Sequence, residues 1–307
     1  MPERTEGTVE RVDATISRVR VGEDLLDCSA RRKLLKFPGD FKKIVVGDRV
    51  RVEHTPRGDT VIAEVLPRRS RLSRPAFRGA GEQVIVANVD ELVVVTAAAD
   101  PEYRTGLIDR YLVIAERVGF PGVVCVNKTD LVDRAAVEHA LAFYRDVGYT
   151  LLFVSARDGS GLDDLRNLLH ERTSVLCGHS GVGKSTLINR LIPGVELPTG
   201  EVSQATGKGR HVTSAVTMLP LPGGGYIVDT PGIREFGLWG IKRDELARYF
   251  PEFARVEGRC KFRSCAHLAE PDCAVKAALA SGQIAPTRYQ SYQRLHHDLP
   301  ATDWQQR

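Results

Sequence analysis

The sequence lacks long apolar runs. None of its apolar stretches approaches the roughly 20 residues that a transmembrane helix needs. The first eleven residues, MPERTEGTVER, contain no apolar core of the kind found in signal peptides. We therefore expect a cytoplasmic protein that has no membrane partner.

Cysteine is also scarce, with six residues in a chain of 307. Thiols in the cytoplasm stay reduced, so we do not expect a disulfide framework. Cys125 and Cys177 lie within apolar, strand-like runs, and we expect them to be buried packing residues. The chain also contains no repeat or low-complexity segment.

The net charge of +4 hides an uneven distribution of charge. Residues 1–80 contain 18 Lys or Arg against 12 Asp or Glu, and residues 81–237 contain 14 against 19. Residues 238–307 contain 11 against 8. Two basic ends flanking an acidic middle favour nucleic-acid contact by the ends. Chance imbalance on a solvated surface is the alternative.

Residues 1–66 contain short runs rich in Val, Ile and Thr, punctuated by Gly, Asp and Pro at hairpin-like spacing. About five short strands in this length predict a barrel of the OB type, a fold whose face binds oligonucleotides. A small β-domain that only packs on its neighbour is the alternative. Aromatic residues are limited to Phe37 and Phe41, so recognition of RNA backbone and shape is favoured over base reading. The basic residues here include Arg31, Arg32, Lys33, Lys36, Lys42 and Lys43.

A basic connector at residues 67–83, PRRSRLSRPAFRGAGEQ, predicts an irregular linker, which either touches phosphates or is simply solvated. Residues 84–237 then alternate apolar strand-like runs with helical stretches, which predicts an α/β domain with a mostly parallel sheet. Residues 238–307 are predicted to be helical. The expected strands are 91–98, 122–128, 150–156, 174–178 and 226–230, and the expected helices are 106–118, 134–147, 162–172 and 183–191.

GHSGVGKS at residues 178–185 matches the phosphate-loop pattern, and it lies between a predicted strand and a predicted helix as that motif requires. Lys184 is expected to contact the β and γ phosphates, and the Ser185 hydroxyl is expected to bind Mg²⁺. The helix N-terminus adds its own favourable field. The expected phosphate-binding residues are Gly178, His179, Ser180, Gly181, Val182, Gly183, Lys184, Ser185 and Thr186.

DTPG at residues 229–232 ends another predicted strand. Asp229 is placed to hold Mg²⁺ through water, and Gly232 can offer its backbone N–H to the γ-phosphate. These residues predict the second half of a nucleoside triphosphate site.

NKTD at residues 127–130 follows a third predicted strand. Asp130 can accept the two N–H donors on guanine's Watson–Crick edge, a pair that adenine lacks. Asn127 can bond the other edge of the base, and the stem of Lys128 can cover its ring. The backbone of Ser155 and Ala156 can bond the guanine carbonyl. The sequence therefore predicts binding of GTP or GDP.

In an ordinary GTPase the phosphate loop precedes NKxD, whereas here it follows it. Read in a circle, the motifs are in the usual order, so the chain is circularly permuted. Permutation is tolerated when the original termini lie close together at the surface.

A cysteine and histidine cluster has the pattern C-x4-C-x-H-x5-C. Three thiolates and one imidazole form a closed tetrahedral zinc set, which predicts a structural Zn²⁺ site. Free buried cysteines beside a surface histidine are the alternative. The predicted ligands are Cys260, Cys265, His267 and Cys273.

The permuted order behind a basic barrel closely resembles the ribosome small subunit-dependent GTPases, the RsgA family, also called YjeQ. The likeness covers essentially the whole chain. It implies a bacterial factor that binds the small ribosomal subunit and its rRNA late in maturation and hydrolyses GTP there; we expect a monomer. The matching segments are VGDRV, EVLPRRSRLSRP, NKTD, SAR, GHSGVGKS, GRHVTS, DTPGIREFGLW and the cysteine cluster.

Two positions bear on catalysis. Similar proteins carry consecutive threonines after the histidine, whereas here Val212 intervenes between His211 and Thr213. Thr213 is the expected switch ligand of Mg²⁺ and the γ-phosphate, with Ser214 as the fallback. Ile233 stands where Ras-type enzymes place the water-orienting Gln, so we expect slow hydrolysis alone and a missing group supplied by His211 or by the ribosome.

Two other functions remain open on sequence grounds. An RNA-binding scaffold that holds guanine nucleotide without turning it over is supported by Ile233. An ATP-using enzyme with a chance NKTD is the other. Turnover with and without small subunits separates the first from a GTPase, and competition between GTP and ATP tests the second.

Overall fold

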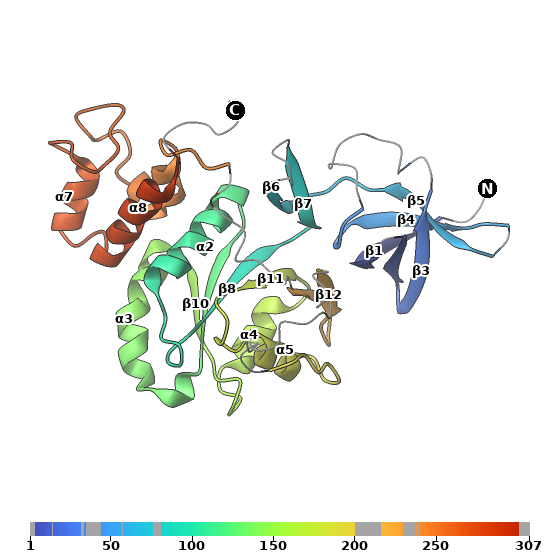
Figure 1. Cartoon of the computed structure of the whole chain (residues 1–307). Helices are drawn as coiled ribbons and strands as arrows, with labels where there is room; N and C mark the ends of the chain where they lie inside the picture. The colour runs from blue at the N-terminus through green and yellow to red at the C-terminus, as the bar shows by residue number, and fades with distance from the viewer. Residues whose placement is uncertain are drawn as a thin grey trace, which may run out of the picture. The chain divides into compact units, whose positions relative to one another are not determined.

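A computed structural model describes residues 4–13, 15–31, 34, 44–56, 58–75, 81–199, 216–229, 238 and 240–300 (Figure 1). The chain forms two compact units. The first contains Met1–Glu91, Arg166–Leu176 and Ile188–Gly237, and the second contains Leu92–Leu165, Cys177–Leu187 and Leu238–Arg307. No helix in the described ranges is long and apolar enough to cross a membrane.

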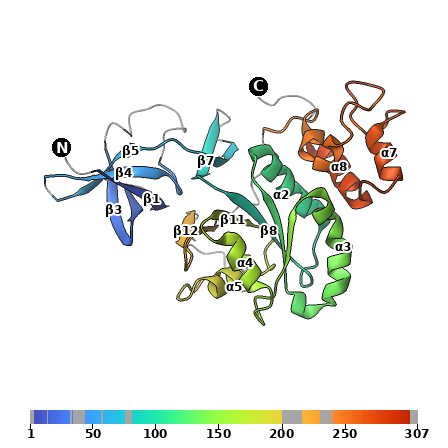
Figure 2. The same cartoon turned by 180° about the vertical axis from the view of Figure 1, so that it is seen from behind.

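Five strands at the start of the first unit close into a barrel, seen from both sides in Figures 1 and 2. They follow the order β1-β2-β3-β5-β4, and pairing of β1 with β4 closes the ring. Alternate side chains point inward, so Val9, Val19, Cys28, Val50 and Ile62 are fully buried. The predicted OB-type barrel is confirmed. Its strands are β1 (Arg4–Val12), β2 (Ile16–Val21), β3 (Asp24–Ala30), β4 (Arg49–His54) and β5 (Thr60–Val65).

The connector at residues 67–83, expected to be irregular, contains a strand. β6 (Arg71–Pro75) pairs antiparallel with β7 (Glu82–Ala87). Leu72 is 2% exposed and lies opposite the buried Val86. The segment RLSRP has a single apolar residue and so shows no alternation of apolar and polar side chains. It forms a strand because it pairs with β7.

The second unit contains three parallel strands in the order β10-β9-β8, together with two long helices. Almost every residue of these strands is buried, as expected for parallel strands covered on both faces. Both helices end at a left-handed glycine, Gly119 or Gly148. The elements are β8 (Glu91–Ala97), α2 (Thr105–Val118), β9 (Gly122–Asn127), α3 (Arg134–Val147) and β10 (Thr150–Phe153).

The first unit also holds all but the last residue of β11 (Thr173–Cys177), which runs parallel to β13 (Tyr226–Asp229). An additional strand, β12 (Thr217–Pro220), lies antiparallel to β13 and pairs on its other side with β1 of the barrel. The strands predicted in the α/β region are therefore present, and the sheet is mostly parallel as expected. β12 was not expected from the sequence.

The last described part of the chain is helical, as predicted. α8 lies along α2 in both views (Figures 1 and 2). The other helices are α4 (Leu162–Leu169), α5 (Lys184–Leu191), α6 (Pro251–Ala254), α7 (Ala274–Ala280) and α8 (Pro286–Asp298).

A buried ion cluster, centred on Arg288, fastens α8 to α2 and α6. Its guanidinium donates two hydrogen bonds to the Glu252 carboxylate, at 2.6 and 3.0 Å, and one to Asp109 Oδ1 at 2.7 Å. The hydroxyl of Tyr144 also donates to Asp109 Oδ1, at 2.8 Å. Burial raises the pKa of Asp109, while Arg288 opposes that shift. Because Arg288 is fully buried, its charge must be compensated by these two carboxylates.

Candidate functional site

The phosphate loop, residues 178–185, is shaped by glycines that no other residue could replace without strain. Gly178 has φ of 145°, and a Cβ there would lie 2.0 Å from the carbonyl oxygen of Val95. Gly183 has φ of 90°, and its Cβ would lie 2.3 Å from Nδ2 of Asn127. Both positions therefore need glycine for conformation and for space.

Lys184 folds back over this loop. Its ammonium donates hydrogen bonds to the carbonyl oxygens of Gly178 and His179, at 2.9 and 2.8 Å. The same residue begins α5, so the unpaired backbone N–H groups of the helix start lie beside it. The segment thus combines a cation with backbone donors, which suits phosphate oxygens.

Asn127 joins two of the predicted motifs to each other. Its Nδ2 donates to the carbonyl oxygen of Val182 at 2.9 Å, and its Oδ1 accepts from the backbone N–H of Ala156 at 3.1 Å. The side chain is 1% exposed. The NKTD motif by itself predicts only a contact between Asn127 and the guanine base. The structure adds a positioning role that the motif alone could not reveal, because the partner lies 55 residues away.

Asp130 is oriented by Ser155. The Ser155 hydroxyl donates to Asp130 Oδ1 at 2.7 Å and accepts from the backbone N–H of Asp158 at 3.2 Å. Arg157 lies 3.9 Å from the other carboxylate oxygen, and the Asp130 side chain is 14% exposed. Nearby, the Lys128 backbone is left-handed and its ammonium donates to the carbonyl of Asp100. NKTD and SAR therefore form one hydrogen-bonded group.

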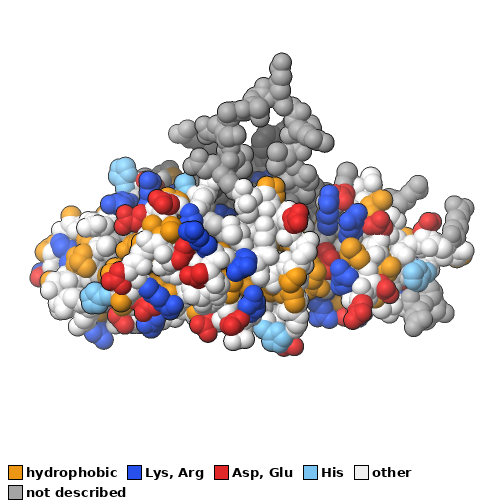
Figure 3. Space-filling view, turned by 90° about the horizontal axis from the view of Figure 1, so that it is seen from below, with side chains coloured by type: hydrophobic (Ala, Val, Ile, Leu, Met, Phe, Trp, Pro, Cys, Tyr) orange, Lys and Arg blue, Asp and Glu red, His pale blue; other side chains and the backbone are white. Residues whose placement is uncertain are grey.

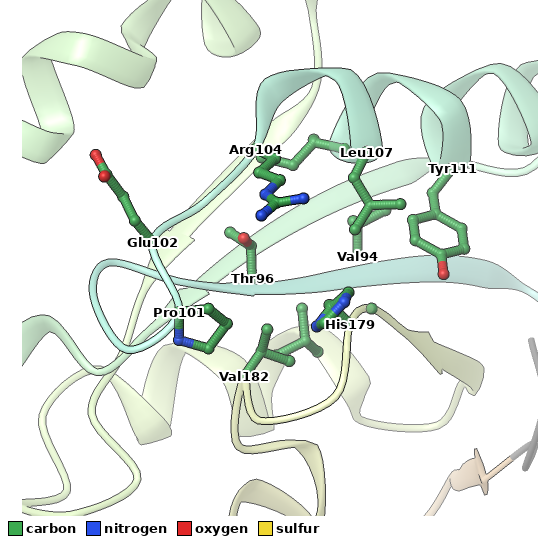
Figure 4. A pocket seen from close by; sticks show the side chains of 12 residues that line it. Val94, Thr96, Pro101, Glu102, Arg104, Leu107, Tyr111, His179 and Val182 are labelled. Carbon is green, nitrogen blue, oxygen red and sulfur yellow. The ribbon is translucent and has the colours of Figure 1, made fainter. Parts of the chain in front are cut away.

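A hollow lies beside the phosphate loop, between β8 and the start of α2 (Figure 4). Figure 4 shows the side chains of Leu107 and Arg104 hanging from the α2 end toward β8, with the His179 ring close to Val94. The lining is predominantly apolar. We expect triphosphate oxygens to bind the loop's N–H groups rather than this hollow.

The predicted magnesium ligands offer hard oxygen donors, the type that Mg²⁺ prefers. Ser185 follows Lys184 in the first turn of α5. Asp229 ends β13 and lies opposite Leu176 in the parallel register, at the carboxyl end of both strands. Thr213, Ser214, His211, Gly232 and Ile233 lie outside the described residues.

The Cys and His side chains near the C-terminus converge on one point. Their ligand atoms all lie within 4.8 Å of one another. Nδ1 of His267 is 3.6 Å from the Cys260 sulfur and 3.4 Å from the Cys273 sulfur, and those two sulfurs are 4.0 Å apart. A tetrahedral Zn²⁺ places such atoms roughly 3.5 to 3.8 Å apart. The four side chains, completed by Cys265, therefore fit a zinc site.

Hydrogen bonds to neighbouring residues hold this cluster in place. Tyr289 and Tyr292 of α8 donate from their hydroxyls to the carbonyl oxygens of His267 and Ala266, both at 2.7 Å. The Glu270 carboxylate accepts from the backbone N–H of Ala266 at 2.7 Å. Burial lowers the pKa of His267, which favours the neutral imidazole that a metal needs. The site is thus preformed around its ligands.

The barrel's arginines differ from the isolated cations expected of an RNA-binding face. All seven arginines described between residues 4 and 66 form an ion pair with Asp or Glu. Figure 3 shows one face of the molecule, on which Lys and Arg alternate with Asp and Glu. Much of the barrel's described positive charge is therefore neutralised locally. These arginines are Arg4, Arg11, Arg18, Arg20, Arg31, Arg49 and Arg51.

Relatives among known proteins match nearly the whole chain. A small ribosomal subunit biogenesis GTPase RsgA from Chlorobaculum tepidum is 45% identical, over 97% of this chain and 99% of its own length. The protein of that name from Pseudomonas aeruginosa is 45% identical, over 85% of this chain and 77% of its own length.

Two solved structures resemble the whole chain. YjeQ from Thermotoga maritima is 32% identical, with a TM-score of 0.80, over 98% of this chain and all of its own. YloQ, a circularly permuted GTPase, is 26% identical, with a TM-score of 0.77, over 97% and 95% of the two chains. These likenesses confirm the permuted fold. The family model of the RsgA GTPase matches residues 65–239. The chain therefore belongs to the RsgA GTPase family, as its motifs predict.

Proposed function

We propose that this GTPase binds the small ribosomal subunit through its rRNA and hydrolyses GTP there, late in the maturation of the subunit. The observation that carries the proposal is near full-length similarity to proteins named small ribosomal subunit biogenesis GTPase. We therefore place the protein in the cytoplasm, where it would act on the subunit. A monomer suffices for this function, because one chain supplies the barrel, the nucleotide motifs and the Cys/His cluster.

We assign nucleotide binding to the motifs described above. Lys184 and the N–H groups of the phosphate loop bind the phosphates, and Asp130 accepts from guanine's two donors. The Ser155 bond, by orienting Asp130, and the Asn127 bridge, by joining base and phosphate motifs, support this assignment. Ser185 and Asp229 are the proposed ligands of Mg²⁺, which would neutralise charge on the phosphates.

We assign slow hydrolysis to the free protein, because Ile233 carries no polar group to orient water. His211, Thr213 and Gly232 remain the proposed contributors near the γ-phosphate. Docking on the subunit then positions the groups around the γ-phosphate, which the free protein does not hold in place. The C-terminal part is a suitable relay, because it follows DTPG directly in the permuted chain.

The decisive experiment measures GTP turnover at saturating GTP and low salt, with small subunits, with large subunits and with neither. We expect at least a tenfold rise with small subunits and far less with large ones. Equal turnover in all three would refute activation and leave a nucleotide-binding scaffold.

Asp130→Asn provides the control for guanine recognition. The amide turns a donor toward guanine's donors, so GTP affinity should fall at least tenfold, while xanthosine triphosphate should bind relatively better. Restored subunit-dependent turnover with xanthosine triphosphate would tie the activity to this site. Unchanged GTP binding would remove Asp130 from it.

A further inference from the structure

The loop between the first two ligands of the Cys/His cluster carries an aromatic ring among cations. Phe262 is 44% exposed. Lys261 and Arg263 flank it in the chain, and Arg259 stands just before Cys260. We name residues 259–263 the RCKFR loop, after its sequence.

The Cys/His cluster anchors this loop at Cys260 and, two residues beyond its end, at Cys265. Cys260 and Cys265 are both members of the set that fits zinc. The backbone N–H of Lys261 donates to the carbonyl oxygen of Asp272 at 3.2 Å, and that of Ala274 donates to the Cys260 sulfur at 3.3 Å. The segment before α7 loops out from the helices (Figure 1). A ring presented on such a stapled loop loses little conformational freedom on binding.

Two of the three cations of the RCKFR loop have no carboxylate partner among the described residues and are available to an external anion. The side chains of Arg259 and Arg263 form no ion pair with any residue in the described ranges. Lys261 pairs with Asp272 at 2.9 Å, and its ammonium lies 6.0 Å from the centre of the Phe262 ring. The contrast with the barrel is direct, because every described arginine there faces a carboxylate.

Single exposed apolar side chains are normal on protein surfaces and need no function. Four large apolar side chains are notably exposed in the described chain: Ile16, Leu25, Leu131 and Phe262. Phe262 is the aromatic member of this set, and it alone lies between two adjacent cations in the sequence. An aromatic face beside unpaired cations is the combination that binds single-stranded nucleic acid, where a base stacks and phosphates meet charge.

We propose that the RCKFR loop binds an unpaired nucleotide of the rRNA, with the base stacked on Phe262 and flanking phosphates at Arg259 and Arg263. The inference rests on the proposed function and identifies a contact for it. An unpaired nucleotide is required because bases within an RNA duplex do not expose a face for stacking. One ring among three cations matches RNA better than an apolar protein surface.

The test measures binding of the full-length, zinc-loaded protein to small subunits and to protein-free small-subunit rRNA, at fixed salt. Phe262→Leu keeps the apolar volume and removes the aromatic face, so it should weaken both interactions about tenfold. Phe262→Tyr keeps the ring and should stay within about twofold of wild type. Arg263→Gln should weaken binding and lower the salt slope by about one. Arg145→Gln is the matched control, since it removes an exposed cation from α3, and it should change nothing.

Zinc content and GTP affinity of each variant must equal those of wild type, which separates loss of contact from loss of folding. If wild type binds subunits and Phe262→Leu binds equally well, the stacking contact is wrong while the proposed function stands. A Leu effect confined to intact subunits would indicate a ribosomal protein and overturn the RNA assignment. If wild type binds neither subunits nor rRNA, the proposed function itself fails.

Discussion

The barrel and the Cys/His segment, residues 259–273, hold their arginines differently. In the barrel, neighbouring strands place carboxylates opposite arginines, as in the pairing of Arg49 with Glu6 at 2.7 Å. In the Cys/His segment, Arg259 and Arg263 stand on a loop with no adjoining strand, and they remain without ion pairs in the described chain. A count of cations along a sequence therefore does not show which of them are free to bind an external anion.

The two regions also differ in what holds them together. The barrel has an apolar core made of residues such as Val9, Val19 and Ile62. The segment from Cys260 to Cys273 has the Cys/His cluster and the hydrogen bonds of two α8 tyrosines. A core that is distributed over strands tolerates local loss, whereas a single cluster fails at once.

The largest expected effect follows from removal of a predicted zinc ligand, which should loosen the Cys/His segment and leave the barrel folded. Cys265→Ser should abolish binding of one equivalent of zinc and expose the segment between α6 and α7 to protease, while the barrel stays protected. Elemental analysis and limited proteolysis with mapped cleavage sites measure both. Cys28→Ser, a buried cysteine of the barrel, is the matched control and should retain zinc. A Cys265→Ser protein with a full equivalent of zinc would mean that the ligand set is wrong.

Loss of the buried ion cluster around Arg288 should have the second-largest effect. Arg288→Met leaves Asp109 and Glu252 buried without their cation, which should lower the free energy of unfolding by about 3–5 kcal/mol. Arg49→Gln in the barrel removes half of an exposed pair and should cost about 0–1 kcal/mol. Denaturant unfolding of both variants provides the comparison. Equal losses would contradict the assignment of Arg288 as the joint between α8 and α2.

The smallest expected effect concerns charge on the barrel. Glu6 pairs with both Arg49 and Arg51, and its side chain is 45% exposed. Glu6→Gln should free Arg49, while Arg51 stays paired with Glu64 at 2.9 Å. The variant should therefore raise affinity for small subunits about two- to threefold and steepen its salt dependence. Binding titrations at several salt concentrations measure this. Affinity that stays constant across the series would show that this face of the barrel lies away from rRNA.

Local patterns predicted most of the fold. The apolar runs around Val94, Val124 and Val175 became buried strands, because parallel strands covered on both faces need such runs. The phosphate loop was equally visible, since its spacing and flanking elements are contained within a few residues. Cys125 and Cys177 are fully buried, as predicted, and burial raises the pKa of Cys125 to about 12.

Features that depend on distant partners were not predictable. Asp109 sits in an apolar helix and Arg288 in a polar one, and the two are 179 residues apart. Neither sequence neighbourhood signals a shared buried cluster. The hydrogen bond from Asn127 to Val182 could not be predicted either, because its partner is 55 residues away. Strand β6 was not visible because it depends on pairing with β7.

The pairing of Arg11 in β1 with Thr217 in β12 has a consequence for solubility. A strand edge with free N–H and C=O groups invites another chain to add to it, and proteins avoid this by covering such edges. Here the first strand of the barrel is the cover for β12. Deleting the barrel, residues 1–66, would uncover that edge of β12, so the shortened protein should self-associate before any loss of RNA affinity could be measured. The barrel is thus also a guard against aggregation.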